Sequence, residues 1–208
     1  MDNILNNNEA WECYYEKTDK QISEERINSI RLIHSNFLEV LLSQNKIFVT
    51  EIGIGTGAMG YTLSCLAKQR GLDLNVFELD YSMKFLRNAQ AFNGNSGIQY
   101  IHSDTFALPM AENFCKQHMI FHQGLMEHFT DHEIRLMLAE QLRVADTVIA
   151  TVPSHKYIFE DGLRGDERLM PLEEWTQIIA PIANINGFYY GLNPGEHYHI
   201  CLIISKKE

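Results

Sequence analysis

The residues best suited to chemistry in this chain begin with a glycine-rich stretch, EIGIGTG, which starts at Glu51. Glycines alternate there at Gly53, Gly55 and Gly57, between a short apolar run and a helical pattern. Glycine lets the backbone turn tightly and approach a ligand with no side chain in the way, while the following helix presents unbonded N–H groups. The stretch therefore predicts a site for a nucleotide-type ligand.

The glycines alone do not decide which nucleotide ligand binds. Gly55, Gly57 and Gly60 also satisfy the pattern G-x-G-x-x-G, in which a helix N-terminus holds the pyrophosphate of a dinucleotide. At this point a nicotinamide-dependent oxidoreductase on a Rossmann sheet is an open alternative.

Two acids at the ends of later apolar runs narrow the choice. Asp80 closes the run in VFELDYS, and Asp104 follows the run GIQYI within HSDTFALP. A carboxylate suits a ribose because its two oxygens can accept hydrogen bonds from two vicinal hydroxyls. Glu78 is the alternative ribose acid if the strand ends earlier. A dinucleotide oxidoreductase has use for one such acid, and has no comparable reason for the second.

These stretches, in this order, resemble the motifs of the class I S-adenosylmethionine-dependent methyltransferases over roughly residues 45–152. The resemblance implies S-adenosylmethionine as the cofactor. Glu51 would help to place its methionine amino group, Asp80 would bind the ribose, and Asp104 would contact the adenine amino group. The cofactor-binding residues expected are Glu51, Gly53, Gly55, Gly57, Glu78, Asp80, Tyr81, Asp104, Thr105 and Gln123.

A fourth segment, QGLMEHF, is similar to the family's G-L-x-E-H segment, which runs beside the sulfonium centre and on toward the acceptor. It makes Glu127 and His128 the candidate catalytic residues, because an imidazole can take a proton from an incoming hydroxyl or amine. The pair is common in the family across unrelated acceptors, so a structural role is equally open. One departure is His118, which stands where the strand usually begins with an acid.

The acceptor is expected to meet residues outside these motifs. Trp11, Tyr14, Phe159 and Glu160 are candidates, although their role could equally be the packing of a lid. Histidines on alternate strand positions share a face for ordinary reasons, so no metal site is expected. The substrate-binding residues expected are Tyr15, His122, Tyr157 and Arg168.

Hydrophobic periodicity predicts the elements that must position these residues. An amphipathic helix over 27–41 follows a capping-box spacing at Thr18 and Gln21. Strands at 46–53, 74–79, 97–101, 118–123 and 146–152 alternate with helices at 61–71, 82–92 and 131–143, which is typical of a parallel sheet. A helix at 172–180 precedes runs at 184–191 and 198–206, whose short connection requires an antiparallel pair. The fold class expected is α/β: a doubly wound, mostly parallel, seven-stranded Rossmann-like sheet that ends in an antiparallel hairpin, with an N-terminal helical lid.

The 208 residues, of which 45% are hydrophobic, predict a single methyltransferase domain, 1–208. Within it we expect an N-terminal helical cap (1–45), a cofactor-binding core (46–152), a substrate loop (153–171) and a C-terminal helix with the hairpin (172–208).

The net charge of −10, from 17 basic and 27 acidic residues, disfavours nucleic acid as a substrate, because such partners require phosphate charge to be neutralised. No stretch is apolar for long enough to span a membrane, and a cytoplasmic location is expected. The function expected is methyl transfer from S-adenosylmethionine to an O or N nucleophile of a small-molecule metabolite. The alternatives are the oxidoreductase and a non-catalytic cofactor-binding accessory protein; the oligomeric state is left open.

Overall fold

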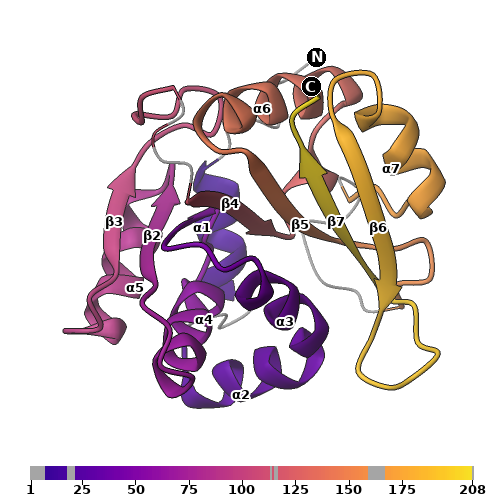
Figure 1. Cartoon of the computed structure of the whole chain (residues 1–208). Helices are drawn as coiled ribbons and strands as arrows, with labels where there is room; N and C mark the ends of the chain where they lie inside the picture. The colour runs from indigo at the N-terminus through magenta and orange to yellow at the C-terminus, as the bar shows by residue number, and fades with distance from the viewer. Residues whose placement is uncertain (1–7, 18–21, 113, 115–116, 159–166, 208) are drawn as a thin grey trace.

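A seven-stranded sheet forms the centre of the computed structural model (Figure 1), which describes residues 8–17, 22–112, 114, 117–158 and 167–207. The strands lie in the order β3-β2-β1-β4-β5-β7-β6. Neighbouring strands among the first five in this order pair in parallel, and β7 is antiparallel to both of its neighbours. This confirms the predicted sheet and its closing hairpin. The strands are β1 (Phe48–Ile52), β2 (Asn75–Asp80), β3 (Gln99–His102), β4 (His118–Gln123), β5 (Thr147–Pro153), β6 (Asn184–Tyr190) and β7 (His199–Ser205).

Helices cover both faces of the sheet (Figure 1). One apolar core packs α2, α3 and α4 against β1 and β4, and the other packs α6 and α7 against β1, β4, β5 and β7. The alternation of side chains along a strand explains the division, since Met119 and Phe121 of β4 enter the first core and Ile120 enters the second. The helices are α1 (Asn8–Lys17), α2 (Glu24–Ile33), α3 (Ser35–Ser43), α4 (Ala58–Gln69), α5 (Met83–Asn93), α6 (Asp131–Val144) and α7 (Leu172–Ile179), with a 3₁₀ turn, η2 (Met126–His128).

The order of the strands reverses direction between β1 and β4. The chain proceeds from β1 outward to β2 and β3, then returns to place β4 on the other side of β1. The connections that leave these two strands therefore diverge at their carboxyl ends, which opens a crevice there. The glycine stretch follows β1 and the QGLMEHF segment follows β4, so the fold brings both to this crevice.

The prediction of one helix over 27–41 is wrong in detail, because the structure has two helices that meet at His34. The ring of His34 is buried and shares a 2.8 Å hydrogen bond with the hydroxyl of Tyr190. The first of the two helices begins at Ser23, whose hydroxyl accepts a hydrogen bond from the backbone N–H of Arg26. The predicted capping residues, Thr18 and Gln21, lie outside the described residues.

No helix in the described part of the chain has both the length and the apolar character that a membrane crossing requires. The division of the domain at residues 45, 152 and 171 stays a prediction.

Candidate functional site

The glycine stretch forms the turn between β1 and α4. Gly53, Gly55 and Gly57 have φ angles of +68°, +53° and +73°, in the left-handed region that side chains other than glycine rarely adopt. A Cβ on Gly57 would lie 2.6 Å from the Cβ of Ala89, so α5 also leaves no room for one. The loop is thus a backbone cradle, and the residues present fit a ligand that must approach the main chain closely.

Two glutamates lie behind this cradle. Glu51 and Glu78 are register partners on β1 and β2, and both are buried. One oxygen of Glu51, Oε2, accepts a 2.7 Å hydrogen bond from the N–H of Gly60. Neither oxygen of Glu78 has a hydrogen-bond partner in the described part of the structure. Burial raises the pKa of both carboxyls well above the ordinary value, and their mutual repulsion raises that of Glu78 further.

Asp80, at the end of β2, faces the glycine turn. Its Oδ1 accepts a 2.7 Å hydrogen bond from the N–H of Ser82, and its Oδ2 accepts one of 3.4 Å from the N–H of Gly55. Burial raises the pKa of Asp80 to about 6, and hydrogen bonds from the backbone, that of Ser82 first, oppose the rise. Of the two acids predicted for the ribose, Asp80 lies beside the turn at the end of its strand. Glu78 points between the strand and α4.

Helix α1 lies across this end of the site. A Cβ on Gly55 would overlap the hydroxyl of Tyr15, whose ring packs against Phe85 with a centroid separation of 4.8 Å. Glu12 and Glu16 of α1 contact Ser82 and Lys84 of the α5 terminus. Burial raises the pKa of Tyr15 to about 12, so its phenol stays neutral at physiological pH.

An open cleft extends from the glycine turn to the carboxyl ends of β4 and β5 and holds about 910 Å³ of empty space, its open mouth included. The predicted residues that line it are Tyr15, Glu51, Gly53, Gln123, Glu127, His128 and Tyr157. At the acceptor end, Trp11 of α1 packs edge-on against His128, with ring centroids 4.7 Å apart. Trp11 and Tyr14 also line the cleft, so α1 contributes aromatic rings to both ends.

Other predicted residues do not line this cleft. Tyr81, Asp104 and Thr105 lie at the neighbouring edge of the sheet, after β2 and β3. His122 is fully buried and belongs to the strand face that packs against α6, because adjacent residues of a strand point to opposite faces. Arg168 donates hydrogen bonds to the carbonyl of Phe129 (2.9 Å) and to Asp131, and so joins its loop to the start of α6. Phe159 and Glu160 lie outside the described residues.

The structure adds a polar network that the sequence did not reveal. The ring of His34 shares hydrogen bonds with the side chain of Gln123 (3.3 Å) and with Tyr190, whose hydroxyl is 2.6 Å from that of Thr151. His199 stacks on Tyr190 with a centroid separation of 5.3 Å. Burial lowers the pKa of His34 to about 3 and that of His199 to about 4, so both imidazoles are neutral in this network. Gln123, Thr151 and His199 line the cleft, which makes the network part of its floor.

Arg26 is the second residue that the sequence did not reveal. It is the one lysine or arginine among the described residues that line the cleft, and its Nε donates a 3.2 Å hydrogen bond to Thr56 of the glycine turn. The signal was weak because Arg26 lies 25 residues before Glu51, in a helix that begins with two exposed glutamates, Glu24 and Glu25.

The sheet order, the glycine turn and the acid at the end of β2 define an α/β enzyme of the Rossmann-like class, which binds a nucleoside-containing cofactor at the carboxyl edge of its sheet. A family model described as a methyltransferase domain matches residues 50–147, from within β1 to the start of β5. No curated protein matches the sequence.

Solved structures share the fold at low sequence identity. One chain of the Haloferax volcanii complex between a methyltransferase activator and a methyltransferase superposes with a TM-score of 0.68 at 12% identity, over 94% of this chain and 97% of that one. The magnesium protoporphyrin IX methyltransferase of Synechocystis with bound S-adenosylhomocysteine gives 0.59 at 14%, over 96% and 94%. The CMeT domain of the citrinin polyketide synthase gives 0.63 at 16%, over 83% of this chain, which spans only 51% of that structure.

The domain match over residues 50–147 supports a class I S-adenosylmethionine-dependent methyltransferase, and the solved structures share its Rossmann-like fold. The antiparallel β7 agrees with this conclusion and disfavours the dinucleotide oxidoreductase, whose sheet would end in another parallel strand.

Proposed function

We propose that this methyltransferase acts on an oxygen or nitrogen nucleophile of a small molecule. One observation carries the proposal: a single cleft runs from the glycine turn and Glu51 at one end to Glu127, His128 and Tyr157 at the other. A donor held at the first end would face an acceptor held at the second, which is the arrangement that an in-line transfer requires.

In this proposal Glu51, the glycine turn, Asp80 and Asp104 hold the cofactor, with Gln123 beside it. Arg26 supplies a positive charge at the glycine turn, where it can bind a carboxylate. Tyr15, with its neutral phenol over Gly55, excludes water from this end. Tyr81 and Thr105 flank the adenine side, and Glu78 supports the loop from behind.

When bound, S-adenosylmethionine supplies an electrophilic methyl group on a sulfonium. The contributions of the protein are alignment of the acceptor and exclusion of water, and Trp11, Tyr14 and Tyr157 supply apolar walls for both. His128 accepts the proton of a hydroxyl or ammonium acceptor, with Glu127 next to it. Arg168 acts indirectly, because it holds the loop that follows the cleft against α6.

Calorimetric titration tests the cofactor, and a panel of acceptors tests the transfer. We expect micromolar binding of S-adenosylhomocysteine and no binding of NADH. Hydroxyl- and amine-bearing metabolites would then be incubated with the enzyme and S-adenosylmethionine, and the products identified by mass spectrometry. Binding of NADH in place of S-adenosylhomocysteine would overturn the proposal, and binding without transfer to any acceptor would favour an accessory role.

The preference for a small molecule rests on the net charge of −10, which works against a polyanionic acceptor. A place for the reaction in biosynthesis and in the cytoplasm, and the expectation that no metal takes part, stay predictions of the sequence.

A further inference from the structure

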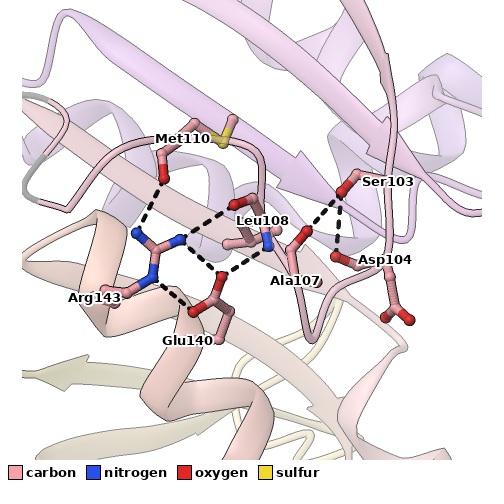
Figure 2. Close-up of polar contacts among 7 residues, drawn as sticks. All are labelled: Ser103, Asp104, Ala107, Leu108, Met110, Glu140 and Arg143. Carbon is pink, nitrogen blue, oxygen red and sulfur yellow. Dashed lines mark hydrogen bonds and ion pairs between the residues drawn. The ribbon is translucent and has the colours of Figure 1, made fainter.

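We propose that Glu140 and Arg143, on the last two turns of α6, are positioning residues for the adenine end of the cofactor. They do not line the cleft. They hold the 103–110 loop, which presents Asp104, in one conformation (Figure 2). This inference deepens the proposed function and rests on it, because it takes Asp104 as the acid that meets the adenine amino group.

Arg143 binds both the backbone of this loop and its partner on α6. Its Nη1 donates a 3.0 Å hydrogen bond to the carbonyl of Met110, and its Nη2 donates one of 3.1 Å to the carbonyl of Leu108. The same guanidinium forms a two-point pair with Glu140, with Nε to Oε2 at 2.7 Å and Nη2 to Oε1 at 2.8 Å. A planar guanidinium can make all four contacts together, whereas a lysine ammonium cannot reproduce this fork.

Glu140 completes a closed set of contacts with the loop. Its Oε1 accepts a 2.8 Å hydrogen bond from the N–H of Leu108, the residue whose carbonyl Arg143 binds. The backbone N–H and the carbonyl of Leu108 are therefore both hydrogen-bonded to one ion pair. The pair is partly shielded, with side-chain exposures of 34% for Arg143 and 17% for Glu140. Loss of Arg143 would leave the carboxylate of Glu140 without its ion-pair partner.

A short hydrogen-bonded turn connects the segment that the ion pair holds to Asp104. The hydroxyl of Ser103 donates to the carbonyls of Ala107 (3.0 Å) and Asp104 (3.3 Å), and the N–H of Ala107 donates to the carbonyl of Asp104 at 3.1 Å. One carboxylate oxygen of Asp104 accepts a 2.9 Å hydrogen bond from the N–H of Phe106. Figure 2 shows the carboxylate of Asp104 pointing away from the ion pair, so its contact with a ligand would be direct and that of the pair indirect.

A second hydrogen bond joins α6 to the same loop. Gln141 of α6, fully buried, donates a 3.3 Å hydrogen bond to the hydroxyl of Thr105, the residue after Asp104. Helix α6 therefore holds the loop at two points, Thr105 within the turn and Leu108 directly after it. Such support is what a binding residue on a loop needs if it is to discriminate between ligands that differ by one hydrogen-bonding group.

The experiment compares two ligands that differ at the group that Asp104 would bind and at the ring nitrogen beside it. S-adenosylhomocysteine has the adenine amino group and an unprotonated N1, and S-inosylhomocysteine has a carbonyl oxygen and an N1–H there. Both are titrated calorimetrically into the wild type and the variants Arg143→Met, Arg143→Lys and Glu140→Gln. The matched control is Arg70→Met, which breaks a comparable pair with Glu39 between α4 and α3.

We expect Arg143→Met to weaken S-adenosylhomocysteine about tenfold and the inosyl analogue by less than about threefold, so that the preference for adenine falls. Arg143→Lys should fall between wild type and Arg143→Met, and Arg70→Met should leave both affinities within about twofold of wild type. If Arg143→Met does not fold, Glu140→Gln, which keeps an acceptor for Leu108, supports the proposal by a smaller loss of preference.

Equal weakening of both ligands, or no weakening, in the folded variants would overturn the positioning role while the proposed function stands. Failure of the wild type to bind S-adenosylhomocysteine would instead overturn the proposed function. The two failures are therefore distinguishable in one set of titrations.

Discussion

The two ends of the cleft are built in different ways. The centre of the cofactor end is backbone from one turn and carboxylates on two adjacent strands, between residues 51 and 80. The acceptor end gathers side chains from α1, η2, β5 and β7, with Trp11 and His199 separated by most of the chain. The first end is determined locally and tolerates little change, whereas the second depends on how distant elements pack and can vary residue by residue.

The difference extends to the chemistry that each end offers. At the glycine turn, positive φ angles and close contacts leave no freedom to place a side chain. On the floor of the cleft, the polar network of Gln123, His34, Tyr190 and Thr151 instead contains two hydroxyls and an imidazole whose donor and acceptor roles can interchange. The predictions below test whether the two ends can be changed independently.

The largest effect is expected for Gly57→Ala at the cofactor end. The left-handed conformation costs an alanine about 1–2 kcal/mol, and contact with Ala89 would force α5 or the turn to shift. Affinity for S-adenosylhomocysteine should fall about 100-fold or more, with a lowered melting temperature, as measured by calorimetry and thermal unfolding. Gly195→Ala is the control, because Gly195 has φ +87° with open space around it. Equal loss of affinity in both variants would contradict the close fit of the turn.

Asp80→Asn should weaken S-adenosylhomocysteine by roughly 10- to 100-fold, since hydrogen bonds to a charged group contribute about 1.5–3 kcal/mol. Because burial places the pKa of Asp80 at about 6, its carboxylate is protonated as the pH falls through that value, and wild-type affinity should decline there. The variant should lose this pH dependence. Asp146→Asn, which removes an exposed partner of Lys206, should change nothing; unchanged affinity in Asp80→Asn would remove Asp80 from the site.

His128→Gln addresses the acceptor end alone. Transfer to an acceptor found in the panel should slow by about tenfold or more through loss of the proton acceptor, while affinity for S-adenosylhomocysteine stays within about twofold. The rate is followed as S-adenosylhomocysteine release, and the exposed His132 on α6 provides the control His132→Gln. A variant that loses cofactor affinity and rate together would show that the two ends are not separable.

The smallest effect is expected for Glu78→Gln, and it concerns stability. Burial holds the pKa of Glu78 above the ordinary value of 4.5, so the folded state retains a proton that the unfolded state releases. The stability associated with this proton is fully present below about pH 4.5 and is lost as the pH rises through the raised pKa. The wild type should therefore lose stability from pH 5 to pH 9, and Glu78→Gln should flatten that decline. Urea unfolding across this range measures the slope, and parallel slopes for the two proteins would contradict the assignment.

The cofactor end could be predicted from the sequence because its signals are local. An apolar run, alternating glycines and a helix predict a turn at one edge of a sheet, and the structure places Glu51 and Asp80 at that turn. The parallel strands and the closing hairpin were predicted from the same alternation of apolar runs, helical patterns and turns, whereas the order of the strands in the sheet was not. The prediction of His122 at the acceptor overlooked a local signal. Alternation along the strand puts His122 on the face opposite Gln123, and therefore away from the cleft.

The acceptor end could not be predicted to the same extent, because its geometry depends on tertiary packing. The break between α2 and α3 at His34 is tied to a hydrogen bond with Tyr190, 156 residues later. Arg168 was expected at the acceptor, but its guanidinium is taken up by Phe129 and Asp131. The same limit applies to Arg26 at the cofactor end, because its entry into the cleft depends on how α2 packs on α4, which no local pattern records.

Helix α6 holds one loop at each of its ends. Its first turn, fixed by the capping box of Thr130 and Glu133, receives Arg168 beside η2, and its last turns hold the adenine-side loop. At 1.5 Å per residue its 14 residues span about 21 Å, and insertion of one residue before Glu140 would turn that side chain by about 100° away from the loop. The length of α6 thus determines whether both loops can be held at once. Insertions or deletions within α6 should therefore be far rarer among related sequences than those in the loop after β5.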